Sequence, residues 1–130
     1  MSVAETMVYG LKKAMSDATN LPFFSEGDTL RGLEYVFISG GIGETIDSNA
    51  GSNTFVAQYF LDYRSNSKDA RTIRNNKSKI LEAFADNTYF HTATVHYYLN
   101  GRVISVEDSE DEEDGYLFRI TITISNTKVG

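Results

Sequence analysis

The sequence contains no cysteine, a single proline and no long apolar run. Without cysteine the chain can form neither disulfide bonds nor thiolate metal sites, which suits a reducing compartment and argues against a small secreted scaffold. No stretch approaches the roughly 18 apolar residues of a membrane span. No apolar run flanked by positive charge stands at the N-terminus, so we expect no signal peptide. With 130 residues and eight tyrosines, the composition is that of one ordered globular domain spanning residues 1–130.

The negative charge of the chain is concentrated in one segment. The formal net charge is −6, and the segment EDSEDEED, residues 107–114, carries seven acidic side chains in eight residues. Without these seven charges the rest of the chain has a net charge of +1. A local block of this kind, called the acidic block below, is typical of a solvated loop tip or of an interaction element.

Two segments have the periodicity of amphipathic helices. In the first, Ser2 and Glu5 stand at capping-box spacing, Lys12 faces solvent, and Asn20 ends the helix. In the second, residues 67–87, Ser67 is the expected N-cap and basic residues crowd the first three turns. The apolar stripe of the first helix consists of Val3, Met7, Val8, Leu11, Ala14, Met15 and Ala18. The apolar stripe of the second helix consists of Ala70, Ile73, Ile80, Leu81 and Phe84.

Strands are predicted at residues 33–39, at residues 53–64 and in the segment YLFRITITIS, residues 116–125. One face of strand 53–64 is apolar throughout. The other face begins apolar and ends with Asp62 and Arg64, which predicts that this strand leaves the core at its end. The apolar face of the last strand consists of Phe118, Ile120, Ile122 and Ile124, which alternate with Arg119, Thr121 and Thr123.

The dipeptide Asn100-Gly101 predicts a two-residue type I′ turn, because both central positions of that turn require positive φ. The turn would join two strands and place Leu99 opposite Arg102. In this register His96 lies on the face opposite Tyr97 and is an exposed or interfacial residue.

The sequence contains no pattern for catalysis or for a specific metal site. A cysteine nucleophile, a G-x-S-x-G elbow and an H-E-x-x-H motif are all absent. His91 and His96 lack a carboxylate at a matching offset. An EF-hand register that puts Gly115 at position six places Thr121 where the bidentate glutamate belongs. We therefore expect a protein that is not an enzyme and has no metal or cofactor. A metal-dependent enzyme that uses the acidic block stays an alternative.

The glycine-rich segment SGGIGETIDSNAGS, residues 39–52, follows a predicted strand and raises the question of a nucleotide site. Gly41 and Gly43 fit the first two places of a G-x-G-x-x-G fingerprint, but Ile46 stands at the third, and loop-forming residues follow where the fingerprint needs a helix. The Gly-Lys-Ser/Thr ending of a P-loop is also missing. The acidic residues of the segment, which would repel phosphate, are Glu44 and Asp47. We therefore expect a long, flexible contact loop between two strands.

The order of these elements resembles that of the tail terminator and tail-completion proteins of long-tailed bacteriophages. The resemblance is carried by the N-terminal helix ending at NLP, by strands 33–39 and 53–64 around the glycine-rich segment, by helix 70–86, and by the closing EDEEDGYLFRITITI. The shared α-β-β-α-β-β plan implies an α+β fold, in which two helices pack on a single antiparallel or mixed β-sheet of about four or more strands.

The resemblance also implies a structural role. Members of this family form rings, expected to be hexameric, that cap the growing tail tube, end its polymerisation and offer a surface to the head–tail connector. The partners would be further copies of the chain, the phage tail tube protein and the connector protein. DNA would pass through the ring without sequence-specific binding. The protein would be found in the virion tail, and in the host cytoplasm during assembly. A tail-tube or head–tail joining protein would look similar, and a non-viral adaptor that uses the acidic block on a basic partner stays an alternative.

Opposite charges on the second helix and in the acidic block predict how subunits meet. The basic residues expected to approach the next subunit are Arg71, Arg74 and Lys77, and the acidic residues that they would meet are Glu110, Asp111, Glu112 and Glu113. In the alternative arrangement the acidic block lines the channel and repels DNA. No aromatic side chain interleaves the basic residues of this helix, and the net charge of the chain is negative, so we expect a protein-facing or solvated surface and not DNA readout. The residues of the glycine-rich segment expected to contact the tube or connector are Gly41, Gly43, Glu44 and Asp47.

Overall fold

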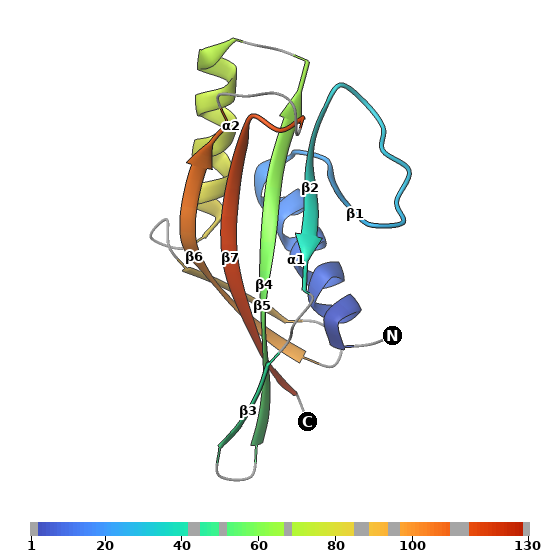
Figure 1. Cartoon of the computed structure of the whole chain (residues 1–130), viewed down its shortest axis with the longest axis vertical. Coiled ribbons are helices and arrows are strands. Elements are labelled where there is room, and N and C mark those ends of the chain that lie inside the picture. Colours follow the sequence, from blue (N-terminus) through green and yellow to red (C-terminus); the bar gives the residue numbers. More distant parts are fainter. Residues whose placement is uncertain are drawn as a thin grey trace.

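The computed structural model describes residues 3–41, 45–49, 52–66, 69–84, 89–93, 97–109 and 115–128. Within these ranges the chain is an α+β protein in which two helices pack on one mixed sheet (Figure 1), and the expected fold class is thereby confirmed. The elements are α1 (Val3–Thr19), β1 (Phe23–Ser25), β2 (Glu34–Gly40), β3 (Thr45–Asn49), β4 (Ser52–Ser65), α2 (Ala70–Ala83), β5 (Tyr89–Ala93), β6 (Tyr97–Asp108) and β7 (Phe118–Lys128).

Seven strands make up the sheet within the described ranges, in the order β1-β2-β4-β7-β6-β5, and β3 also pairs with β4. The β1–β2 pair is parallel and every other pair is antiparallel. Strand β4 is 14 residues long and pairs with β7 on one side and with β2 and then β3 on the other. Strands β4 and β7 therefore form the centre of the sheet. The short strands β1 and β5 were not expected from the sequence.

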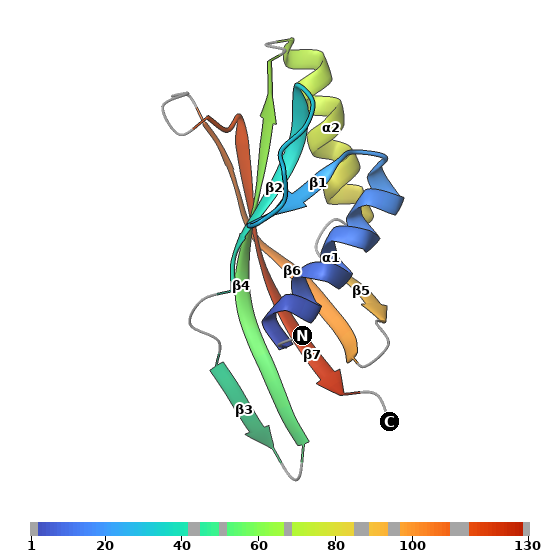
Figure 2. The same cartoon turned by 90° about the vertical axis from the view of Figure 1, so that its right-hand side faces the viewer.

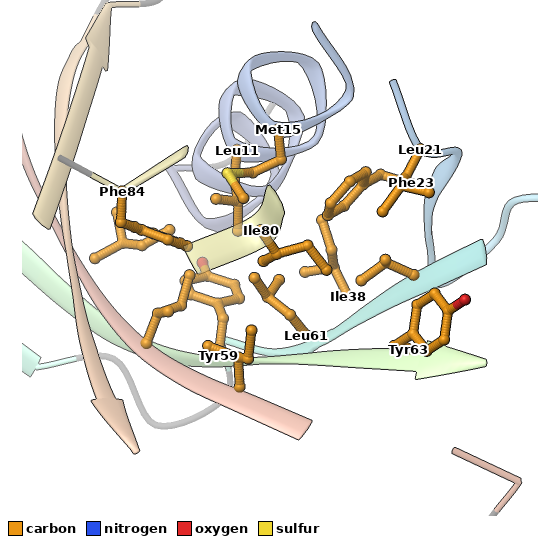
Figure 3. Packing of buried hydrophobic residues seen from close by; sticks show 14 of the residues in the cluster. Leu11, Met15, Leu21, Phe23, Ile38, Tyr59, Leu61, Tyr63, Ile80 and Phe84 are labelled. Carbon is orange, nitrogen blue, oxygen red and sulfur yellow. The ribbon is translucent and has the colours of Figure 1, made fainter. Parts of the chain in front are cut away.

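Both helices lie on the same face of the sheet (Figure 2), and the hydrophobic core fills the space between them and the strands. Leu11 and Met15 of α1 and Ile80 of α2 point toward the side chains of Tyr59 and Leu61 on β4 (Figure 3). The predicted alternation of the last strand is confirmed, because its four apolar residues are buried: Phe118, Ile120, Ile122 and Ile124. Among the described elements no helix covers the opposite face, which is called the open face below.

The predicted turn at Asn100-Gly101 is wrong. Strand β6 continues through both residues, so that Asn100 pairs with His91 and Ser125, and Gly101 pairs with Phe90 and Ile124. The predicted pairing within this segment does not occur. Backbone pairing on both sides of β6 is available only in the folded sheet, and here it outweighs the local preference of an Asn-Gly dipeptide for a turn.

The expected long loop at residues 39–52 is partly strand. Residues Thr45–Asn49 form β3 and pair with β4, and the β3–β4 hairpin projects beyond the rest of the sheet (Figure 1). Strand β4 extends past the end of β2, so its N-terminal residues would otherwise leave their backbone groups unpaired on this side, and β3 satisfies them. Residues 42–44 and 50–51 lie outside the described ranges.

The expectation that β4 leaves the core at its C-terminal end is also wrong. Asp62 is 2% exposed and Tyr63 is completely buried. This end of β4 lies between β2 and β7, because Tyr63 pairs with both Val36 and Phe118. A charged residue can be buried there because a residue on β7, Arg119, neutralises it.

Both helices differ from the expected stripes at one end. In α1, Ala18 is exposed and Thr19 is buried instead, where its hydroxyl donates to the Met15 carbonyl at 2.6 Å. In α2, Ala70 is exposed and the N-cap is Asp69, whose carboxylate accepts from the Arg71 amide. The expected N-cap at position 67 and residues 85–87 lie outside the described ranges.

Candidate interaction surface

The open face carries arginine and aromatic side chains at the end of the sheet near the start of β2. Side chains alternate along a strand, so Asp62 and Arg64 point away from the helices while the intervening Tyr63 points toward them. Register places Phe37 opposite Asp62 and Tyr35 opposite Arg64. The side chains that form this surface are Phe24, Tyr35, Phe37, Phe60, Asp62, Arg64, Tyr116 and Arg119.

Arg119 is neutralised and held in place within this surface. Its Nε and Nη2 atoms donate to the two carboxylate oxygens of Asp62 at 2.7 and 3.0 Å. The guanidinium lies 4.6 Å from the ring centroid of Phe60 and 4.8 Å from that of Tyr116. The hydrogen bonds from Asp62 raise the pKa of Arg119 above its ordinary value. This bidentate pair fixes β7 against β4 and leaves little charge for a ligand.

Arg64 has no equivalent partner. Its guanidinium lies 5.5 Å from the ring centroid of Phe37, and its Nε atom is buried without a hydrogen-bond acceptor. The carboxylate of Asp62, two residues earlier on the same face, is occupied by Arg119. Buried N–H donors normally have an acceptor, so this donor is an exception in the described part of the chain.

A polar network behind the open face connects α2 to the sheet. The Tyr63 hydroxyl donates to Glu34 Oε2 at 2.6 Å, and the Asn76 side-chain amide donates to the same oxygen at 3.1 Å and to the Tyr63 hydroxyl at 2.8 Å. Burial and then the hydrogen bond to Glu34 raise the pKa of Tyr63. Asn76 was not among the residues predicted from the sequence to have a role. The signal was its spacing, because Asn76 stands between Ile73 and Ile80 on the buried stripe of α2.

The structure connects the basic helix to the acidic block within one chain. Lys77 Nζ lies 2.8 Å from Asp108 Oδ1, near the start of the acidic block. Arg71 and Arg74 are exposed on α2. Of the acidic residues expected to meet them, all four lie outside the described ranges: Glu110, Asp111, Glu112 and Glu113.

Gly41 of the predicted contact loop has a packing role. Gly41 adopts φ +79°, and a Cβ atom at this position would lie 2.6 Å from Cε1 of the buried Tyr59 ring. Its amide donates to the Gln58 carbonyl at 2.9 Å. Gly43 and Glu44 lie outside the described ranges. Asp47 belongs to β3, and its side chain lies outside the described part.

A second exposed feature is the loop between β1 and β2. Lys12 does not face solvent freely as expected, because its Nζ atom contacts Asp28 Oδ2 at 2.8 Å and the Ser25 hydroxyl at 3.2 Å. The hydrogen bond from Lys12 and then that from the Ser25 amide lower the pKa of Asp28. The anchored loop exposes two large apolar side chains, Leu30 and Leu33.

The described residues carry no other recognised type of site. No three histidine, aspartate or glutamate side chains among them are grouped so as to hold a metal ion. His96 and the side chain of His91 lie outside the described part. Neither α1 nor α2 is both long and apolar enough to cross a membrane. Compared with known protein families the chain matches none, and no curated protein is detectably similar to it in sequence.

Proposed function

We propose that this protein is a structural virion protein that caps a phage tail tube as an oligomeric ring, ends tail polymerisation and joins the tail to the head connector. The observation that supports the proposal most is the open face, because protein interfaces are enriched in arginine and aromatic side chains. Half-buried aromatic residues, among them Phe24, Tyr35 and Phe37, lie on a sheet face without a helical cover. An antiparallel sheet of this kind faces either solvent or a partner, and this composition favours a partner.

The ring would form through a heterologous contact, in which one patch of a subunit meets a different patch of the next. Since Lys77 is already paired with Asp108 in its own chain, Arg71 and Arg74 are the cations of α2 that would meet the next subunit. Their partners would be the residues from Glu110 to Glu113. The mechanism is binding without chemistry, and it involves neither a metal nor a cofactor. In the alternative arrangement the acidic block lines the channel and keeps DNA from adhering.

The β3–β4 hairpin is the element that we assign to the tube or connector. It projects from the body of the protein, so it can reach a partner that the helices do not touch. The same feature favours a second candidate function, that of a tail-tube protein, because a projecting hairpin can bridge successive subunits in a stack.

Negative-stain microscopy of the concentrated protein, with and without Mg²⁺, tests the proposal. Closed rings with a central hole are expected. Long stacked tubes would favour the tail-tube function, and a stable dimer under all conditions would favour the adaptor and contradict the ring.

Charge reversal then tests the subunit contact. The double variant Glu112→Lys with Glu113→Lys should lose the ring. A matched control reverses two exposed acidic residues elsewhere, Asp17→Lys with Glu26→Lys, and should keep it. Rings of normal size from the first variant would show that the acidic block does not form the subunit contact.

A further inference from the structure

Arg64 is a half-buried cation whose positive charge is not neutralised within the described part of the chain. Both oxygens of the neighbouring Asp62 carboxylate accept hydrogen bonds from Arg119, and the buried Arg64 Nε has no acceptor. A guanidinium has five N–H donors in a fixed plane and cannot lose its charge at any physiological pH. Leaving such a donor buried and unpaired carries a free-energy cost that an incoming acceptor would remove.

The surroundings of Arg64 hold its guanidinium beside aromatic side chains. The ring of Phe37 lies 5.5 Å away, and Tyr35, directly across in register, makes an edge-to-face contact with Phe24 at 5.8 Å. A Cβ atom added at Gly115 would still lie 4.0 Å from Arg64 Nη1, so the backbone there does not crowd the guanidinium. Arginine stacked on an aromatic ring can still use its edge to bind a planar anion through two hydrogen bonds.

We propose that Arg64 is the binding residue for a carboxylate on an acidic segment of a second protein, and that Phe37 and Tyr35 pack against the apolar atoms around that carboxylate. A carboxylate fits better than a phosphate or a nucleic acid. The acidic block ends at position 114, directly before Gly115, so its negative charges would repel the closely spaced charges of a phosphate backbone more strongly than a segment whose carboxylates alternate with apolar residues. Arginine flanked by aromatic side chains is also typical of binding hot spots between proteins.

The ligand comes from a different protein and not from the acidic block of a neighbouring copy. Tyr63 is hydrogen-bonded to Asn76 of α2, and Arg64, the next residue of β4, points to the opposite face of the sheet. An acidic block that binds Arg71 and Arg74 on α2 is therefore on the other side of the sheet from Arg64. The choice of a different protein as the source of the ligand rests on the proposed ring contact. The Arg64 site itself does not, since the open face is present in a single subunit.

A direct test follows the Arg64 Nε–H resonance by ¹⁵N–¹H NMR during titration with a terminally blocked peptide of alternating glutamate and leucine. The control peptide replaces each glutamate by glutamine. The titration is run at 0.15 M salt, where the Debye length is about 8 Å and repulsion from the acidic block is screened. We expect the Arg64 resonance to shift with saturation, and the control peptide to bind about tenfold more weakly or worse, which corresponds to the loss of one charge-assisted hydrogen-bonded pair.

Variants of Arg64 distinguish the effect of the planar guanidinium group from the effect of its positive charge. Arg64→Lys keeps the charge but loses the planar fork, and Arg64→Gln loses both, so both should weaken binding of the glutamate peptide. The control Arg102→Gln removes an exposed arginine of β6 and should leave binding of the glutamate peptide unchanged. Far-UV circular dichroism of each variant shows that the fold is kept, and the wild-type titration tests the proposal even if a variant fails to fold.

Three results would overturn the inference. The Arg64 resonance could stay unchanged while the peptide binds, or the glutamine peptide could bind equally well, and in either case Arg64 does not recognise a carboxylate. Alternatively, the Arg64 resonance could already have the shift of a bound carboxylate before peptide is added. If that shift disappeared when the acidic residues of the acidic block were changed to Asn and Gln, the chain's own acidic block would be the ligand. Failure to form rings with a positive titration would remove the proposed function and leave the Arg64 site standing.

Discussion

Substitution of Gly41 by alanine should destabilise the protein strongly, because two separate effects add at this position. Its φ of +79° costs an alanine roughly 1–2 kcal/mol relative to glycine. The added Cβ would also lie 2.6 Å from Cε1 and 3.0 Å from Cζ of Tyr59. That ring is completely buried, and its hydroxyl lies 3.9 Å from Met7 Sδ, so it cannot swing into solvent. Overpacking of this kind typically adds about 1–3 kcal/mol.

The matched control is Gly32→Ala. Gly32 has nearly the same φ, +83°, but a Cβ there has no neighbour within 4 Å, so only the conformational cost applies. Urea unfolding followed by circular dichroism should therefore show that Gly41→Ala loses about 2 kcal/mol more than Gly32→Ala. If the two losses agree within about 0.5 kcal/mol, the Tyr59 ring moves aside at little cost and the packing argument is wrong.

Three further predictions concern polar contacts. A double-mutant cycle of Asp62→Asn and Arg119→Met should give a coupling of about 1–2 kcal/mol, because Asp62 is buried while Arg119 is partly exposed; a coupling near zero would contradict this. Asn76→Ala should lower the free energy of unfolding, measured in urea, by about 1–2 kcal/mol, because Asn76 donates to both Glu34 and Tyr63. The control Asn75→Ala, at an exposed position, should hardly change it, and equal losses would refute the role of the network. The pKa of Asp28 lies below its ordinary value of 3.8 in the folded protein, so its stabilising effect is present above pH 3.8 and is lost as the pH falls. Asp28→Asn should therefore lose less stability than the wild type between about pH 5 and pH 2; parallel curves would show that the Lys12 contact is not made.

The parts of the fold that depend on local periodicity could be predicted from the sequence. The alternation of isoleucines in β7 and the three- and four-residue spacing in both helices report directly on which side chains are buried. The errors at Ala18 and Ala70 fall at helix ends, where small residues satisfy the pattern whether or not the core extends that far.

The parts that depend on pairing between distant strands could not be predicted. Whether Asn100-Gly101 turns or continues is decided by β5 and β7, which lie on either side of it only in the folded sheet. The pair of Asp62 with Arg119 joins residues 57 positions apart, so it required the β4–β7 register. The unpaired state of Arg64 follows from that same pair, and for this reason the candidate interaction surface appeared only with the structure.

The position of β7 has a consequence for the order in which the protein folds. Strand β7 lies between β4 and β6, and six of the nine register pairs between β4 and β7, such as Tyr59 with Ile122, join residues more than 60 positions apart. Closing such a long loop costs entropy before any contact offsets it, and folding is correspondingly slow. The locally paired units β2–β4 and β5–β6 can form earlier, but neither can complete the core. During synthesis, β4 therefore lacks its neighbour β7 until β7 has left the ribosome. Until then, the apolar face of the sheet around β4 is incomplete and open to solvent. In that interval this face is available to chaperones and to off-pathway association.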